Sequence, residues 1–422
     1  MSCTLPKFAL ALACLAPAAS ADLWTVAEAG GPGVDFTDIQ PAVNAAADGD
    51  TVLVQAGTYG AIVIDGKELT VQGDGEVIVI ELTVFGAGGL RINNTAPDQS
   101  VVVRGIQFQH TSTTGFATTQ VRDCAGPVLL EECSTAFALL PGPPEGPGCL
   151  ISNSSSVTLA RCDIFGAGNE SLQNSHALIV EDSDAFVHDS TLTGGYGTDD
   201  TGLPFNPAFD GAPAVLMNGG RLFVSGSVLR GGTGGGCASI SGCACIPYGN
   251  GGAGVRLQSG APVVRIVDSV VEGGVGGSGG AECPPRTWGT TGADTVIESG
   301  QLLDLPGTAR SLALSSPITT GVDILSETMT GEPGDFAVLF FSVHLSEAVE
   351  FLAWNGYLHA YQNFILSPKG ALPAGGTLVS RVAINPLGLA EATVYVQGVY
   401  VNAGGQAFLT GPSATTLMDP GR

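Results

Sequence analysis

The chain is poor in positive charge. Of its 422 residues only 15 are lysine or arginine, whereas 39 are aspartate or glutamate, which gives a net charge of −24. A surface this acidic repels nucleic acid and anionic lipid, so neither is an expected partner. Acidic polysaccharides would be repelled as well, unless a divalent cation bridged the two surfaces. Ca²⁺ is therefore compatible with the composition, but no cofactor is certain.

Long hydrophobic runs are absent except at the start. Lys7 precedes an apolar run from Phe8 to Pro17, and Ala19-Ser20-Ala21 follows with small residues. This order is typical of a secretory signal peptide, which we predict over residues 1–21. No later run reaches the roughly 18 apolar residues of a membrane span. The sequence thus predicts a secreted protein, extracellular or at the cell surface, with no membrane span.

Several catalytic and cofactor motifs are also missing. The chain contains neither H-E-x-x-H nor G-x-S-x-G. Gly274, Gly276 and Gly279 match G-x-G-x-x-G, but "GAECPPRTWG" follows and cannot form the helix that a dinucleotide site requires. We interpret these glycines as loop residues that let the chain turn tightly. No metal site is predicted.

What the sequence does have is 62 glycines and a repeated phrase. Apolar or small residues recur at offsets 0, 2, 5 and 7 in segments that begin at Val77, Val101, Val128, Val157, Ala185, Leu222 and Val264. Offsets 0 and 2 indicate a strand with one buried face, and the step of three indicates a bend. Repeats of 24 to 42 residues with this pattern predict a β-solenoid, in which coils stack and bury one another's apolar faces. Stacking would form one inward ladder from Cys133, Cys162, Ser190, Ser227 and Ser269.

A second strand follows in each coil, at 176–184, 212–220, 253–260 and 292–300. Between the two ladders lie three long insertions, which we predict as lateral loops at 193–211, 230–252 and 272–291. Insertions at the same corner of successive coils must stack on one side of the solenoid, so they are expected to form a lateral lobe.

These repeats resemble the pectin-lyase-like right-handed parallel β-helix superfamily. "VDFTDIQPAVNAAADGDTVLVQAGTY" (34–59) is similar to the N-terminal cap of that superfamily, with Thr37 and Gln40 expected as a capping box. Ile39, Val43 and Ala46 would cover the end of the core. The resemblance implies a β-helix over residues 22–300 and suggests carbohydrate as a ligand, but it covers enzymes and non-enzymes alike.

Residues 301–422 break the repeat. Apolar segments such as "GDFAVLFFSVHL" and "AEATVYVQGVYV" alternate with turns and lack the repeat period. We predict a small β-sandwich for this region. The expected fold class is therefore all-β: a right-handed parallel β-helix with a short N-terminal capping helix, followed by a β-sandwich.

The cysteines of an exported protein favour disulfides over metal binding. Equivalent places on adjacent coils suggest that Cys133 pairs with Cys162, and proximity in sequence suggests Cys124 with Cys149. The loop phrases "CACIP" and "AECPP" align Cys245 with Cys283, which leaves Cys237 with Cys243.

An enzyme of this superfamily that degrades acidic polysaccharide would need arginine or lysine near acidic residues. The weak basic candidates are Arg221, Arg256 and Arg265. Asp199 and Asp200 are weak candidates for the pair of carboxylates that cleaves a glycosidic bond in a hydrolase. The favoured explanation of each arginine is a solvated residue that balances an acidic surface.

Aromatic side chains give the clearest indication of a site. Five of them fall within the three insertions, namely Tyr196, Phe205, Phe209, Tyr248 and Trp288. Such residues bind sugar rings by stacking, or pack together as the core of a lobe. We therefore expect a non-catalytic secreted protein that presents a binding face for polysaccharide or another extracellular component. The alternatives are a lyase-like or hydrolytic polysaccharide-degrading enzyme and a purely structural repeat protein.

Overall fold

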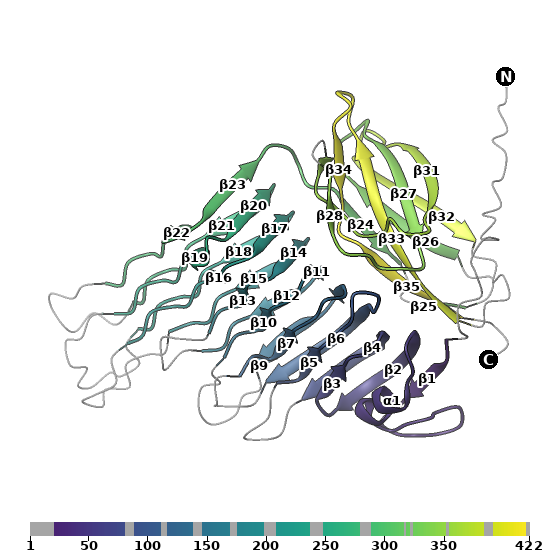
Figure 1. The fold of residues 1–422 in the computed structure, drawn as a ribbon. Helices are drawn as coiled ribbons and strands as arrows, with labels where there is room; N and C mark the ends of the chain where they lie inside the picture. The colour runs from purple at the N-terminus through teal and green to yellow at the C-terminus, as the bar shows by residue number, and fades with distance from the viewer. Residues whose placement is uncertain are drawn as a thin grey trace.

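The computed structural model describes residues 21–80, 88–110, 116–137, 146–168, 175–197, 208–236, 248–278, 288–315, 318–320, 324–351, 354–383 and 391–418. The regular secondary structure of these residues consists of β-strands and a single short helix, α1 (Ile39–Ala45). Figure 1 shows a long stack of coils with a smaller group of strands against its side. In the described part of the chain, no helix has the length and hydropathy needed to cross a membrane.

The coils form a right-handed parallel β-helix, as predicted, and their strands make up three faces. The first face is a parallel sheet of β3 (Ile62–Asp65), β5 (Leu90–Asn93), β7 (Thr119–Arg122), β10 (Cys149–Ser152), β13 (Leu178–Glu181), β16 (Val215–Asn218), β19 (Val255–Ser259) and β22 (Thr295–Ile297). The other two faces belong to one 15-stranded sheet that bends within each coil.

The second face begins with β1 (Leu23–Val26) and the first parts of β2 (Asp50–Tyr59), β4 (Leu69–Ile80) and β6 (Val101–His110). It continues through β8 (Val128–Glu131), β11 (Val157–Ala160), β14 (Asp184–His188), β17 (Arg221–Ser225), β20 (Val263–Val267) and β23 (Gln301–Leu305). The third face holds the later parts of β2, β4 and β6, then β9 (Ser134–Phe137), β12 (Asp163–Phe165), β15 (Thr191–Thr193), β18 (Val228–Arg230) and β21 (Val270–Glu272).

The predicted register is confirmed from Val101 onward. The ladder runs through Val101, Val128, Val157, Ala185, Leu222 and Val264, all of them buried. The first repeat was wrong, because Val77 lies opposite Ile106 and Leu69 lies opposite Val101. A register shift after Gln72 places extra residues at this corner, and a fixed offset cannot follow such a shift.

The bend between the second and third faces has a repeated structure. In each coil a residue with positive φ occupies the bend: Glu132, Arg161, Asp189, Gly226 or Asp268. The next residue points inward, and these residues are Cys133, Cys162, Ser190, Ser227 and Ser269. The hydroxyl of each serine accepts the backbone N–H of the preceding coil, as Ser190 does from Cys162 at 2.9 Å and Ser227 does from Ser190 at 3.1 Å. The predicted inward ladder is therefore confirmed, and its polar atoms are satisfied by neighbouring coils.

The N-terminal end of the β-helix is closed by α1. Ile39, Val43 and Ala46 are buried on the apolar core, as predicted. The predicted capping box is wrong: the N-cap is Asp38, whose carboxylate accepts the N–H of Ile39. Gln40 instead bonds to the backbone of Val63 in β3, so this side chain fixes the helix to the first face.

The remaining strands form the small sandwich. One sheet contains β24 (Ser311–Leu314), β26 (Ile324–Thr330) and β32 (Thr377–Ala383). The other contains β25 (Ile318–Thr320), β27 (Phe336–Ser342), β29 (Trp354–Asn355), β31 (Ile365–Ala371), β33 (Glu391–Val401), β34 (Ala407–Leu409) and β35 (Ser413–Met418). A short pair, β28 (Val349–Glu350) and β30 (Tyr357–Leu358), lies beside them. Leu312, Met329, Leu339 and Val396 are part of its buried core.

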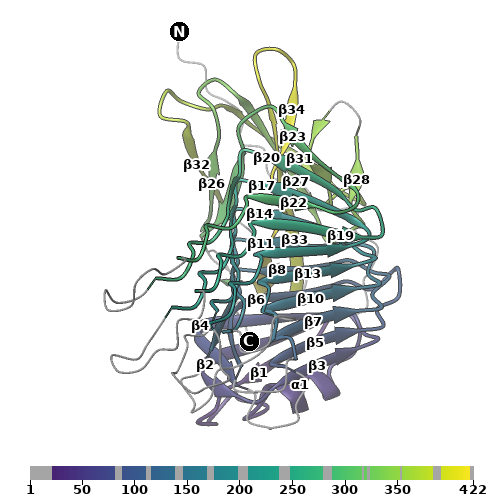
Figure 2. The ribbon, with the colours of Figure 1, turned by 90° about the vertical axis from the view of Figure 1, so that its left-hand side faces the viewer.

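The sandwich packs on the outward side of the second face. Val102 and Leu129 of the β-helix bury against Tyr395 and Ala414, and farther along Phe186 and Phe223 bury against Tyr357. The strands of this face are therefore apolar on both sides, as in a sheet covered by other layers. Figures 1 and 2 show the sandwich along one flank of the coil stack.

Candidate functional site

The described ends of the three lateral loops leave the coils on one side of the β-helix (Figure 2). Their segments are 194–197, 208–212, 231–236, 248–254, 272–278 and 288–294, and almost none of this backbone is in a β-strand. One row of backbone hydrogen bonds crosses these segments, in which each N–H donates to the carbonyl of the next residue in the row. The row runs through Gly292, Gly274, Gly252, Gly232 and Ala212, with N···O distances of 2.7–2.8 Å. The lobe thus begins as a bundle of extended segments joined through their backbones.

A second row of hydrogen bonds lies three residues away. It runs from Gly289 through Gly277, Gly249 and Gly235 to the carbonyl of Phe209. A spacing of three matches the polyproline II helix, which has three residues per turn and no internal hydrogen bonds, so its polar groups are free to pair with neighbours.

These glycines are required by close packing. A Cβ on Gly252 would collide with the carbonyl oxygen of Ala212, and one on Gly274 with that of Gly232, well inside the 3.0 Å that real Cβ atoms keep. None of the glycines in the two rows has a positive φ. The interpretation of Gly274 and Gly276 as residues that let the chain turn tightly is therefore wrong: neither has a positive φ, and both are packed too closely for a side chain. Gly279 lies outside the described residues.

The bundle orders three of the five candidate aromatics. Phe209, Tyr248 and Trp288 lie at the level of the second hydrogen-bond row, one on each returning segment. The rings of Tyr248 and Trp288 are 6.1 Å apart between centroids, with an interplanar angle of 38°. Phe209 is half-buried and Tyr248 is buried, whereas Trp288 is 62% exposed. Tyr248 is therefore part of the lobe core, while Trp288 is mostly exposed beside it.

Tyr196 and Phe205 are not part of this row as described. Tyr196 lies on the outgoing segment of the first loop, where its ring packs against Gly168 of the preceding coil and 53% of the residue is exposed. Phe205 lies outside the described residues. Among the described residues of the lobe, Tyr196 and Trp288 are therefore exposed aromatic residues on separate segments.

The arginine candidates are all in ion pairs. Arg221 Nε donates to Asp184 at 3.0 Å, and Arg256 Nε donates to Glu298 at 2.9 Å. Arg265 pairs with Glu350 of the sandwich and donates to the Tyr357 hydroxyl at 3.1 Å. The hydrogen bond to Asp184 raises the pKa of Arg221, which makes it a poorer proton acceptor.

The two aspartate candidates, Asp199 and Asp200, lie outside the described residues. In the part of the chain that is described, no three His, Cys, Asp or Glu side chains converge as a metal-binding cluster.

The predicted disulfides of the scaffold are wrong. Cys124, Cys133, Cys149 and Cys162 are free thiols in the buried core. Cys133 and Cys162 stack on adjacent coils, but parallel stacking holds their Cβ atoms about 4.8 Å apart and pointing the same way, which is too far for a disulfide. Cys149 lies in β10 of the first face, whereas Cys124 lies at a corner level with Ser154. Cys237, Cys243, Cys245 and Cys283 lie outside the described residues.

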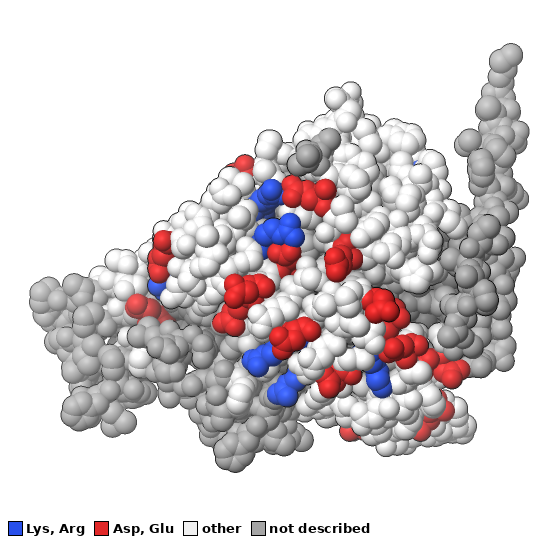
Figure 3. All heavy atoms as spheres, viewed as in Figure 1, with Lys and Arg blue, Asp and Glu red and all other residues white. Residues whose placement is uncertain are grey.

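A polar groove follows the corner between the first and second faces. It is lined by Arg122, Ser152, Asn153, Glu181, Asp182, Asn218, Gln258, Ser259 and Gly260, with a volume of about 700 Å³. On the side of the molecule seen in Figure 3, acidic side chains predominate along the β-helix and its border with the sandwich. The groove contains carboxylates and amides but no aromatic ring, so it lacks a stacking surface.

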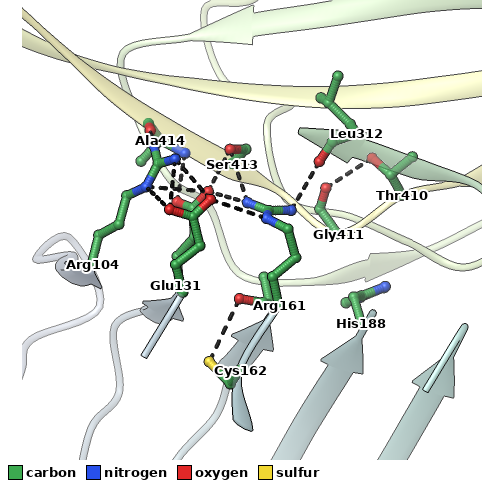
Figure 4. Close-up of polar contacts among 12 residues, drawn as sticks. Arg104, Glu131, Arg161, Cys162, His188, Leu312, Thr410, Gly411, Ser413 and Ala414 are labelled. Atoms are coloured by element: carbon green, nitrogen blue, oxygen red, sulfur yellow. Dashed lines mark hydrogen bonds and ion pairs between the residues drawn. The ribbon is translucent and has the colours of Figure 1, made fainter. Parts of the chain in front are cut away.

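Sequence reasoning missed a buried ionic cluster between the two domains (Figure 4). Glu131, fully buried at the end of β8, pairs with Arg161 and accepts from Ser413 and from the N–H of Ala414 at 2.9 Å. Arg104 donates to the carbonyl of Ala414 and to Glu132 at 2.9 Å. The signal was a charged residue at the end of an otherwise apolar strand, as in "VVVR" and "VLLE".

The cluster is electrostatically balanced. Burial pushes the pKa of Glu132 upward, but Arg104 and Arg161 outweigh it and hold this pKa below its usual value. Arg161 also donates to the carbonyl of Leu312 at 2.8 Å, and so contacts the sandwich directly. The contacts are charge-assisted hydrogen bonds between the domains, and this role is structural.

Comparison with known proteins gives distant matches among solved structures. No protein-family model and no curated protein matches the chain. Tailspike protein 4 of bacteriophage CBA120 aligns with 87% of the chain and 64% of its own length, at 11% identity and a TM-score of 0.29. Pectin methylesterase from Aspergillus niger aligns with 64% of the chain and 89% of its own, at 13% identity and a TM-score of 0.23.

Tailspike protein 2 from an Escherichia coli O157:H7 bacteriophage covers 93% of the chain at 11% identity and a TM-score of 0.29. The chain spans 63% of that tailspike and 64% of tailspike protein 4, so it covers less than two thirds of either. Similarity at this level does not assign a function.

Proposed function

We propose that the protein is an exported, non-catalytic binding protein that recognises carbohydrate through the exposed aromatic residues of its lateral lobe. The observation that carries this proposal is Trp288, a residue that is 62% exposed and lies at one end of an aromatic row. Trp288 adjoins Gly289, which is tied into the hydrogen-bonded bundle, so the ring stands on a backbone that is fixed before any ligand arrives. Pre-organisation of this kind lowers the entropy cost of binding.

Carbohydrate is the favoured class because an indole face stacks on the C–H face of a sugar ring, while neighbouring polar groups bond to the hydroxyls. Thr290 lies two residues after Trp288 in the sequence, and its hydroxyl donates to Asn250 of the neighbouring segment at 2.8 Å. The acidic surface favours a neutral polysaccharide over an anionic one. The resemblance of the repeats to the pectin-lyase-like superfamily is consistent with the same class.

Retention on immobilised neutral and acidic polysaccharides, with and without Ca²⁺, tests the proposal. Trp288→Ala is expected to weaken retention by about 10-fold or more, equivalent to about 1.4 kcal/mol. Phe336→Ala is the matched control, because Phe336 is 46% exposed in the sandwich, away from the lobe. Equal retention of wild type and Trp288→Ala would contradict the proposal.

The rival function is polysaccharide cleavage in the polar groove, where Glu181 and Asp182 supply carboxylates. Assaying new reducing ends in the same incubations separates the two functions. Release of reducing ends that is lost in Glu181→Gln would replace the binding proposal with the enzymatic one.

A further inference from the structure

Two histidines are buried where the sandwich meets the β-helix. His188 ends β14, and His359 directly follows β30; each is 1% exposed. The Nε2 atom of His188 and both ring nitrogens of His359 have no hydrogen-bond partner. Buried polar groups without partners are rare in folded proteins, so this pair calls for an explanation.

The surroundings of both rings are apolar and tightly packed. His359 meets the ring of Phe186 edge-on at 5.1 Å, and His188 lies 5.6 Å from Phe223. Gly411 of the sandwich lies directly over His188, since a Cβ at that position would fall 2.8 Å from the His188 Cβ (Figure 4). A neutral imidazole fits this space, but an imidazolium would have no acceptor for its second N–H.

The charges that face the pair make protonation harder still. Arg161 lies near His188, and each histidine would repel the other if both were cations. Asp189, next to His188, is the nearby carboxyl group on the β-helix. On the sandwich side Tyr357 packs against Phe186 and Phe223, and its hydroxyl accepts from Arg265. The ion pair of Arg310 and Asp335 lies farther away, near Tyr400.

We propose that acidification releases the sandwich from the second face of the β-helix, because docking requires both His188 and His359 to stay neutral. Burial, with Arg161 adding to it at His188, lowers the pKa of each histidine to about 3 from the ordinary 6.5. Once undocked, both rings would reach water and regain their usual affinity for protons. Docking is therefore fully favoured above pH 6.5 and is progressively lost as the pH falls below it.

One group opposes this effect. Burial raises the pKa of Asp189 to about 6, so this carboxyl takes up a proton more readily in the docked state and favours docking below pH 6. Protonation of Asp189 offsets the effect of one histidine on docking at most, whereas protonation of the two histidines weakens docking. Each histidine weakens docking by about 10-fold per pH unit below 6.5, so the net effect remains a loss.

Release would expose an apolar strip on the β-helix. Val102, Leu129, Phe186 and Phe223 are at most 3% exposed in the docked state. They lie on β6, β8, β14 and β17, along much of the length of the second face. The two domains stay joined through residues 306–310, so release is an opening of one chain and is expected to be reversible.

Small-angle X-ray scattering of the mature chain from pH 7.5 to pH 4 tests the proposal. The radius of gyration is expected to rise in a reversible transition below pH 6.5, while far-UV circular dichroism shows both domains still folded. His188→Gln/His359→Gln, which stays neutral at every pH, is expected to shift the midpoint down by at least one pH unit. His176→Gln is the matched control, because His176 is also buried but lies in the β-helix away from the sandwich.

Hydrogen exchange on the wild type covers the case in which the double variant fails to fold. After correction for intrinsic rates, the amides of Ala348 and Ala414, which donate to Ser156 and Glu131 across the interface, are expected to lose protection at pH 5, whereas peptides from β10 and β13 of the first face keep it. A constant radius of gyration down to pH 4.5 would overturn the proposal. So would an unchanged transition in a folded double variant, or an equal loss of protection at the Ala348 and Ala414 amides and in β10 and β13.

Discussion

The second and third faces of the β-helix are parts of one bent sheet, yet they turn different residues outward. On the second face Val102, Leu129 and Phe223 point away from the core and are at most 3% exposed. On the third face Phe165 is 38% exposed and Val270 is 47% exposed. The inward pattern is the same on both faces, because it only specifies a coil. The outward residues record what covers each face, which is the sandwich on one and solvent on the other.

Charged pairs on the two faces should show the largest difference. Glu131→Gln removes the fully buried counter-charge of Arg161 and is expected to cost about 3–5 kcal/mol in the free energy of unfolding. Glu272→Gln on the third face breaks the exposed pair with Arg230 and is expected to cost less than about 1 kcal/mol. Chemical denaturation at pH 7 measures both. Similar costs for the two variants would mean that the sandwich does not enclose the second face.

The second largest difference in stability between the two faces is expected when apolar side chains are truncated. Phe223→Ala removes a ring held between the β-helix and Tyr357, so we expect a loss of about 3 kcal/mol. Val270→Ala removes two methyl groups that are already half in water, so we expect a loss below about 1 kcal/mol. Thermal unfolding followed by circular dichroism compares them. A loss of less than about 1 kcal/mol in Phe223→Ala would mean that the sandwich contacts the sheet elsewhere.

A third prediction concerns the lobe that extends from the third face. Gly252→Ala forces a Cβ onto the carbonyl of Ala212 and is expected to cost about 1–3 kcal/mol, confined to the bundle. Gly375→Ala is the control, since nothing lies within 4 Å of its Cβ position. Hydrogen exchange should show weaker protection of the Gly232 and Gly274 amides and unchanged protection in β14. Full protection in Gly252→Ala would contradict the close packing of these segments.

The smallest effect is expected at the corner shared by both faces. Cys162→Ser should change stability by less than about 1 kcal/mol, because Ser190 already fills the equivalent place one coil later. Burial raises the pKa of Cys133 to about 12 and that of Cys149 to about 11, so these thiols stay protonated in neutral solution. Iodoacetamide should therefore leave Cys133, Cys149 and Cys162 unlabelled until the protein unfolds. A disulfide-linked peptide joining Cys133 to Cys162 in a mass spectrum would refute the free thiols.

The coil architecture was predictable from sequence because stacking repeats the same inward residue every coil. The register from Val101 to Val264 and the serine ladder at the corner followed from spacing alone. Register failed only at Val77, where a shift in β4 breaks the fixed offset. Domain docking was visible in principle, since "VLLE" and "AFVH" are apolar at successive positions and so indicate strands buried on both sides.

The candidate site was less predictable. The sequence showed that aromatic residues cluster in the insertions. It did not show that Trp288 is exposed while Tyr248 is buried, because this difference depends on which segment lies at the end of the stack. The glycine bundle was missed because the hydrogen bonds of its two rows join residues 12 to 28 positions apart in the sequence. Glycines spaced by three, as at 232 and 235 or 249 and 252, were the available signal.

Fluorescence of a single-tryptophan protein tests the central claim most directly. The chain has three tryptophans, so Trp24→Phe/Trp354→Phe leaves Trp288 as the only indole. Acrylamide quenching is measured as each retained polysaccharide is added. The account predicts that Trp288 is strongly quenched in the free protein and becomes protected, with a shifted emission, as the sugar binds. Saturating retention on a polysaccharide with no change in Trp288 quenching would contradict it.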